Sequence, residues 1–196
     1  LCEVPEFSWT VEPILESRQI SLAGVAHEGN PRIDVVTTDF STALAENELI
    51  LLIVPAYAHR PFAEACAPHL RSGQIVVVMP GTLGALEFAQ VLRERGVTAD
   101  VTLAETDTAP YVCRKMSPTS AHIWGVVEKL GMGVLPSSQG SRVQQIVEKW
   151  FPGVTLYPHV VACGLAAMNP VVHPAGVLLT AGRVEKSRGE FYFYDE

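Results

Sequence analysis

Two continuous apolar runs, each followed by a segment of helical periodicity, constrain the fold of this chain more than any other feature. Leu49–Val54 and Ile75–Met79 are apolar without alternation, as strands are when both faces of a parallel sheet are covered. Residues 58–70 and 83–95 space their apolar side chains as helices do, and a glycine follows each segment. Strands that alternate with helices are typical of βαβ units. We therefore expect an α/β fold with a doubly wound parallel sheet.

The remaining pattern extends this sheet and ends in a helical segment. Ile20–Ala26 and Arg32–Thr38 flank a turn sequence and predict a hairpin, and Asp39 can cap a short helix that runs through Glu46. Beyond Pro158 the chain is rich in Ala, Gly and Leu, so we expect one domain over 1–158 and the start of a helical domain over 159–196. Further strands are predicted at residues 101–104, 111–114, 121–130 and 155–157, and further helices at 138–151, 160–168 and 174–181, the last beginning at Pro174.

Charge and cysteine usage exclude several classes of function. Fourteen Lys and Arg against 21 Asp and Glu give a net charge of −7, and no basic run exceeds Arg114–Lys115, so we expect no nucleic-acid partner. The longest apolar run, Leu49–Ala58, contains Pro55 and is shorter than the roughly 20 residues of a membrane span. The four cysteines form no C-x-x-C pair and the histidines no H-x-x-H pair, so we predict no metal site and a cytoplasmic protein with reduced thiols. Because the chain opens on Leu1, we also expect it to be a piece of a longer protein.

Three predicted strands end in segments that could form a ligand site. Ligands of open α/β sheets bind outside the carboxyl ends of the strands. Here these ends are Val54-Pro55-Ala56, Met79–Thr82 and Ala104–Thr106. Proline and glycine after strands are also ordinary turn residues, so ligand binding and simple turn formation are about equally favoured. No G-x-G-x-x-G follows a strand, so the first phosphate-binding turn of a dinucleotide fold is expected outside this chain.

Two further segments carry residues that suit catalysis or substrate binding. His173 lies in Asn169–Pro174, where few polar neighbours would solvate its charge, which suits a general acid or base. A buried histidine with both nitrogens hydrogen-bonded is the alternative, favoured by composition at roughly two to one. Cys113 follows Glu105 by eight residues, and the pair could line a pocket or simply occupy an edge strand. His59 is predicted to begin a helix rather than to act in catalysis.

Several stretches, in order along the chain, resemble the opine dehydrogenases of the octopine and nopaline type. The N-P-x-x-H-P sequence of Asn169–Pro174 is the most specific of them. The resemblance extends from about Thr37 to the end of the chain. The matching stretches are Thr37–Asp39, Val54–His59, Met79–Gly81, Glu105–Thr106, Pro110–Arg114, Asn169–Pro174, Leu178–Leu179 and Arg183–Glu185.

This resemblance implies a Rossmann-like domain, then a helical domain, with the active site in the cleft between them. Members of the family are NAD- or NADP-dependent oxidoreductases that reductively condense the amino group of an amino acid with a 2-oxo acid. A homodimer is the assembly we expect. The residue roles implied are His173 as general acid or base, Val54, Pro55, Ala56, Gly81 and Thr106 as cofactor-binding residues, and Glu105 and Cys113 as substrate-binding residues. Glu105 would approach the amino group of the amino acid or the nicotinamide, and Cys113 the 2-oxo acid.

Two other functions stay open at the level of sequence. A 2-hydroxy-acid reductase of the ketopantoate type would depend on a lysine in the second domain, and none of the four lysines lies within the His173 motif. A non-catalytic dinucleotide-binding module would keep the fold and lose the chemistry. The flanking coding sequence would separate these alternatives, because an enzyme needs the glycine-rich turn upstream and an acidic residue downstream.

Overall fold

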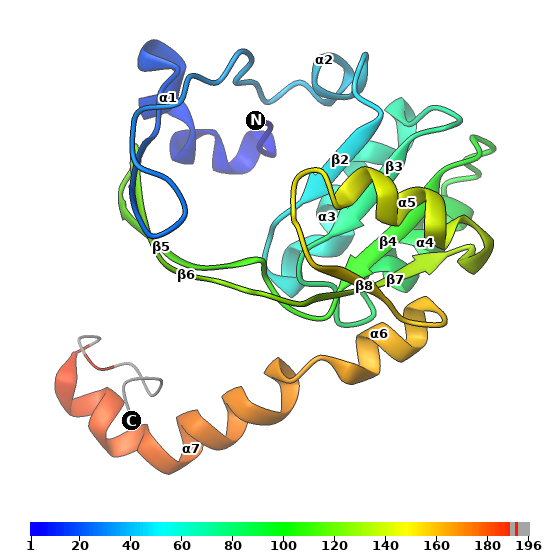
Figure 1. The fold of residues 1–196 in the computed structure, drawn as a ribbon. Helices are drawn as coiled ribbons and strands as arrows, with labels where there is room; N and C mark the ends of the chain where they lie inside the picture. Colours follow the sequence, from blue (N-terminus) through cyan, green and yellow to red (C-terminus); the bar gives the residue numbers. More distant parts are fainter. Residues whose placement is uncertain (189–190, 192–196) are drawn as a thin grey trace.

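A mixed five-stranded sheet forms the core of the computed structural model, which describes residues 1–188 and residue 191 (Figure 1). The first three strands in its order are parallel, the fourth is antiparallel to the third, and the fifth is parallel to the fourth. The strands, in sheet order, are β2 (Leu49–Leu52), β3 (Ile75–Val78), β4 (Thr102–Thr106), β7 (Leu130–Leu135) and β8 (Val154–Leu156). The predicted α/β class is confirmed. The predicted parallel sheet is confirmed for β2, β3 and β4, and β7 adds an antiparallel pair with β4.

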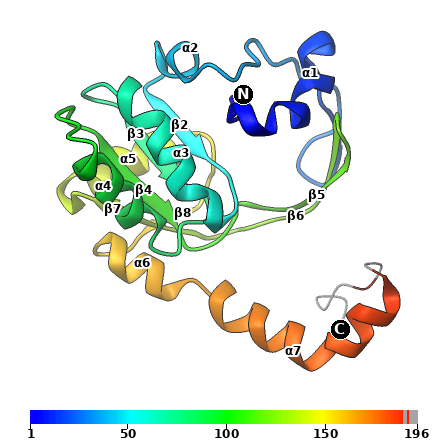
Figure 2. The same ribbon diagram turned by 180° about the vertical axis from the view of Figure 1, so that it is seen from behind.

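Helices cover both faces of this sheet, so the interior strand β3 is buried on both sides. Val76 and Val78 pack on one face with α2 (Phe40–Leu44), α3 (His59–Cys66) and α4 (Gly84–Glu94). Ile75 and Val77 pack on the other face with α5 (Gly140–Val147). Figure 1 shows α5 in front of the sheet, and Figure 2, from behind, shows α3 and α4. The predicted helices on these faces are confirmed with shorter bounds.

A separate three-stranded sheet extends from the core. Its order is β1 (Ser21–Gly24), β6 (Ser120–Val126) and β5 (Tyr111–Ser117). β5 pairs antiparallel with β6. The hairpin predicted over residues 20–38 forms only in part, as the isolated antiparallel bridges Gln19–Arg32 and Leu22–Gly29. β1 pairs in parallel with β6, and residues 32–38 contribute only isolated bridges such as Gln19–Arg32. β1 therefore forms its ladder of backbone hydrogen bonds with the distant strand β6 and not with the second arm of the predicted hairpin.

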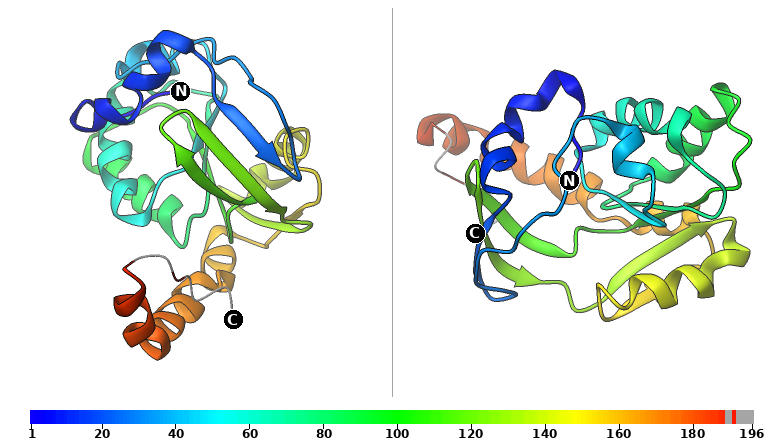
Figure 3. Two further views of the ribbon diagram at one scale, coloured as in Figure 1. Left: turned by 90° about the vertical axis from the view of Figure 1, so that its left-hand side faces the viewer. Right: turned by 90° about the horizontal axis from the view of Figure 1, so that it is seen from above.

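The chain ends in two helices, α6 (Val160–Ala166) and α7 (Asn169–Ser187). α6 packs against β4 and β7, whereas α7 extends away from both sheets (Figure 3). The predicted helix start at Pro174 is wrong: α7 begins at Asn169, with Pro170 in its first turn, where a missing amide hydrogen has no cost. Tyr192–Tyr194 of the C-terminal aromatic run lie outside the described residues.

The short elements join these layers. They are the 3-10 helices η1 (Pro5–Thr10), η2 (Ala56–Ala58), η3 (Ala67–His69) and η4 (Ser137–Gln139), and the helix α1 (Glu12–Ser17). By length and composition alone, the stretch of residues 160–187 could cross a membrane, since an 18-residue window within it has a mean hydropathy of 1.4. In this structure the first part of that stretch, α6, packs on the sheet.

Candidate active site

A groove of about 690 Å³ lies where the loops after β2 and β3 meet the first turns of α7. It brings together four of the predicted cofactor-binding residues and the predicted acid or base, which come from three distant parts of the chain. It is lined by Ile53, Val54, Pro55, Ala56, Met79, Pro80, Gly81, Thr82, Ala109, Asn169, Pro170, His173 and Pro174.

Parallel pairing of β2 with β3 explains why two of these loops lie side by side. Leu52 is paired with Val78, so both strands end at the same edge of the sheet. After β2, Pro55 is extended and leads into η2 and α3. After β3, the chain passes Gly81, where a Cβ would overlap the side chain of Glu105. Gly81 therefore lets the loop lie close against β4.

His173 reaches the groove from the second turn of α7. The lining residues Asn169, Pro170, His173 and Pro174 have the spacing of one helical face. The His173 side chain is half-buried. Pro174 has no amide hydrogen, so the helical hydrogen bond to the carbonyl of Pro170 is missing in the turn that carries His173. The groove thus combines apolar walls with one titratable side chain.

Three other predicted site residues do not line this groove. Glu105 is fully buried behind Gly81, and its carboxylate accepts hydrogen bonds from backbone amides of Leu83 and Ala85. Burial raises the pKa of this carboxyl, and the two amide hydrogen bonds act in the opposite direction. Thr106 is buried too, and its hydroxyl donates to the carbonyl of Thr108 at 2.8 Å. Cys113 is exposed on β5 in the other sheet. Contacts of these residues with substrate or cofactor stay predictions.

His59 begins α3 and lies directly behind the groove. It is only 2% exposed, and a Cβ at Gly84 would come within 2.5 Å of its Nδ1. Its Nε2 has no hydrogen-bond partner within the described structure. Burial lowers the pKa of His59, while the charge of Glu87 acts to raise it. A histidine in this setting packs α3 against α4, as its sequence position predicts.

Asn169 and Pro170 line the groove, yet the sequence pattern gave them no role of their own. The signal that could have identified them is the helical spacing from Asn169 to His173, which places all three on one face once the helix is known to begin at Asn169. Among the described residues, no three His, Cys, Asp or Glu side chains gather as they would around a metal ion.

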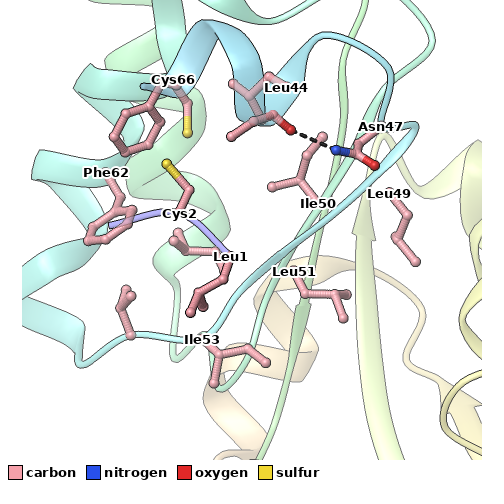
Figure 4. Close-up of a pocket in the computed structure, with 14 residues that line it drawn as sticks. Leu1, Cys2, Leu44, Asn47, Leu49, Ile50, Leu51, Ile53, Phe62 and Cys66 are labelled. Atoms are coloured by element: carbon pink, nitrogen blue, oxygen red, sulfur yellow. Dashed lines mark hydrogen bonds between the residues drawn. The ribbon is translucent and has the colours of Figure 1, made fainter. Parts of the chain in front are cut away.

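A second pocket, of about 300 Å³, lies between the first residues of the chain and β2 (Figure 4). Leu44, Ile50 and Phe62 give it an apolar lining, and Cys2 and Cys66 contribute thiols. Burial raises the pKa of Cys66 to about 12, so this thiol stays protonated near neutral pH. Such a lining does not suit acid–base chemistry, and the groove at His173 is the candidate active site.

Comparison with known sequences identifies the relatives of this chain. No family model matches it. It is 32% identical over 176 residues to an opine dehydrogenase from an Arthrobacter species, a match that covers 89% of this chain and 47% of that protein. It is 26% identical over 172 residues to vitopine synthase from Allorhizobium ampelinum, with 85% and 45% covered. The chain therefore spans about half the length of the curated relatives it matches.

Solved structures show the same fold. Octopine dehydrogenase in complex with NADH and agmatine matches 96% of this chain and 48% of its own, with a TM-score of 0.71 and 20% identity. Yersinopine dehydrogenase matches 91% of this chain and 45% of its own, with a TM-score of 0.72 and 16% identity. A 2-dehydropantoate 2-reductase from Porphyromonas gingivalis gives a lower TM-score of 0.59, with 12% identity over 90% of this chain and 58% of its own. The relatives named opine dehydrogenase, together with the shared fold, support the assignment of this chain to the opine dehydrogenase family.

Proposed function

We propose that this chain forms the cofactor-facing part of an NAD- or NADP-dependent opine dehydrogenase, which reductively condenses an amino acid with a 2-oxo acid. The observation that carries the proposal is the single groove in which His173 faces Val54, Pro55, Ala56 and Gly81. Relatives support it: one is named opine dehydrogenase, and solved relatives are described with NADH and pyruvate, or with NADP+ bound.

The groove suits the nicotinamide end of a dinucleotide. Val54, Pro55, Ala56 and Met79 offer an apolar wall for a flat ring, and Gly81 allows the backbone to come close to it. The described residues that line the groove include no Lys or Arg and the sequence contains no G-x-G-x-x-G turn, so no residue here is assigned to the pyrophosphate. When bound, the dinucleotide supplies or accepts the hydride.

The residues of this chain would exchange a proton with the substrate and keep water away from the reacting atoms. Condensation of an amine with a 2-oxo acid releases water and gives an imine, and reduction of that imine consumes one hydride and one proton. His173, the titratable side chain of the groove, is placed to exchange that proton with the substrate. The apolar walls keep water away from the reacting atoms.

A ketopantoate-type reductase is less well supported. That chemistry would require a lysine in place of His173, and the groove lining contains none. The structural likeness is also smaller, with a TM-score of 0.59 against 0.71 for octopine dehydrogenase. A cytoplasmic location and a homodimer belong to the same proposal as the activity.

Steady-state kinetics test this function. NAD(P)H oxidation by the complete protein should be followed with a panel of pairs of amino acids and 2-oxo acids. For the active pair, His173→Ala should lower kcat about a hundredfold or more, because a positioned acid or base contributes roughly 10²–10⁴. The matched control is His27→Ala, since His27 is exposed and does not line the groove. No turnover with any pair, or unchanged turnover in His173→Ala, would refute the proposal.

A further inference from the structure

The carboxylate of Glu105 lies where the segments that build the groove converge. It extends from the end of β4 to the start of α4, where Oε1 accepts from the amide of Leu83 at 3.0 Å and Oε2 from the amide of Ala85 at 2.8 Å. Met79, Pro80, Gly81 and Thr82, immediately before these amides, line the groove. Both oxygens of Glu105 therefore hold the loop that forms one groove wall.

Two glycines leave the space that the Glu105 side chain occupies. A Cβ at Gly81 would lie 2.6 Å from Glu105 Cδ, and a Cβ at Gly164 would lie 2.7 Å from Oε1. Gly81 belongs to the groove wall after β3, whereas Gly164 belongs to α6, the helix that leads into α7 and His173. In addition, the Cys163 thiol of α6 donates to the backbone carbonyl of Glu105 at 3.3 Å. Glu105 is thus packed between the two elements that carry the opposite walls.

The backbone of the wall explains why such a contact is needed. Thr82 has φ 50° and Leu83 has φ 69°, so two consecutive non-glycine residues adopt the left-handed conformation. Side chains other than glycine adopt it at an energetic cost, and it persists only where the surroundings impose it. The hydrogen bond from Leu83 to Glu105 is one such constraint, because it fixes the amide that joins the two residues of this strained pair.

We propose that Glu105 is a positioning residue that fixes the β3–α4 loop relative to α6, and thereby sets the separation between the cofactor-binding wall and His173. This inference rests on the function proposed above and adds a residue that does not touch the reactants. It gives the buried carboxylate a different role from the substrate contact that the sequence predicts.

The test compares two variants that each remove one carboxylate from the start of α4. Glu105→Gln replaces one acceptor oxygen with an NH₂ group that faces a backbone amide. Glu87→Gln is the matched control, because Glu87 lies in the first turn of α4 with its side chain 41% exposed and forms an ion pair with Arg60 at 3.8 Å. Two quantities are measured: amide hydrogen exchange at residues 81–85 and the Kd for NAD(P)H from its fluorescence.

In Glu105→Gln, exchange at the amides of Leu83 and Ala85 should be about tenfold faster or more, because hydrogen bonds to a charged group are among the strong ones. NAD(P)H binding should weaken by about tenfold, while β3 and β4 keep their wild-type exchange. Glu87→Gln should change neither quantity. Gly81→Ala keeps every charge but inserts a methyl group where Glu105 lies, so it should reproduce the Glu105→Gln result.

The outcomes separate the two proposals. A wild-type protein that binds no NAD(P)H would refute the proposed function, and the exchange measurement would still decide the role of Glu105 in the loop. A folded Glu105→Gln variant with wild-type exchange and affinity would overturn the positioning role. Exchange that rises throughout the sheet in both Glu105→Gln and Gly81→Ala, or failure of both to fold, would also overturn it, because Glu105 would then be a determinant of the fold.

Discussion

Helices α4 and α7 differ in a way that neither length nor apolar content explains. α4 has 11 residues and buries four of them, whereas α7 has 19 residues and buries none within the described structure. Leu178 and Leu179 of α7 are 77% and 88% exposed. The sheet covers the apolar face of α4, while α7 meets the rest of the chain at the groove through its first turns. Most of the stability of an apolar helix in a protein comes from what packs against it.

Helix α6 connects the sheet, on which α4 packs, to α7. It packs on the sheet through positions without side chains, since a Cβ at Gly133 would lie 2.6 Å from Val160 Cα. Because α7 follows α6 after two residues, the close packing of α6 fixes where His173 enters the groove. The packed body therefore supplies both the cofactor wall and the direction of the helix that carries the proposed acid or base.

The largest expected effect comes from opening a cavity under α4. Phe88→Ala should lower the free energy of unfolding by about 3–5 kcal/mol, because Phe88 is fully buried against the sheet. Leu179→Ala, an aliphatic truncation on α7, should change it by less than about 0.5 kcal/mol. Urea denaturation followed by circular dichroism measures both. If Leu179→Ala lowered the free energy of unfolding nearly as much as Phe88→Ala, α7 would be covered by further protein and would not differ from α4 in burial.

Glycine replacements should have opposite signs in α6 and α7. At Gly164 a Cβ would meet Leu83 Cδ2 at 2.5 Å and Leu83 N at 2.9 Å, so Gly164→Ala should cost about 1–3 kcal/mol. At Gly182 nothing lies within 4 Å, and Gly182→Ala should stabilise α7 by about 0.5–1 kcal/mol. Denaturation measures the first change, and amide exchange along α7 the second. If Gly164→Ala and Gly182→Ala changed stability in the same direction, the packing around the glycines of α6 and α7 would not differ as described.

The sequence predicts those elements whose signals are local. The continuous apolar runs at β2 and β3 and the helical periods of α3 and α4 are confirmed. β7 was not predicted as a strand, because Gly131 and Gly133 lower strand propensity. Tertiary packing explains why glycine occupies these two positions, since Gly131 leaves space for Asp107 and Tyr157, and Gly133 leaves space for α6. The predicted hairpin is reduced to isolated bridges for a similar reason: the strand that pairs with β1 lies about 100 residues away in the chain.

The same distinction holds for the candidate site. The rule that ligands bind at the carboxyl ends of parallel strands predicts the wall of Val54 and Gly81, and the family resemblance predicts His173. The environment of Glu105 could not be predicted, because its partners are backbone amides about 20 residues away that carry no side-chain signal. A buried carboxylate and a substrate-binding carboxylate look alike in sequence.

The smallest expected effect concerns helix capping, in which the body and α7 also differ. Asp39 caps α2 by accepting hydrogen bonds from the amides of Ser41 and Thr42, whereas no side chain caps α7. Hydrogen bonds from the hydroxyl of Thr42 and, to a smaller extent, that of Ser41 lower the pKa of Asp39 to about 2.

Because the pKa of Asp39 is lower in the folded protein than in the unfolded chain, the stabilisation by this cap is present above about pH 4 and is lost as the pH falls towards 2. Asp39→Asn should therefore destabilise the protein slightly at pH 6, and the difference in Tm from wild type should vanish near pH 2. Thr42→Val is the sharper variant, since it keeps the carboxylate and should move its pKa, measured by carboxyl carbon NMR, back towards 3.8. If the pKa of Asp39 in the wild-type protein were near 3.8, the ionised cap would not stabilise α2, and α2 and α7 would not differ in this respect.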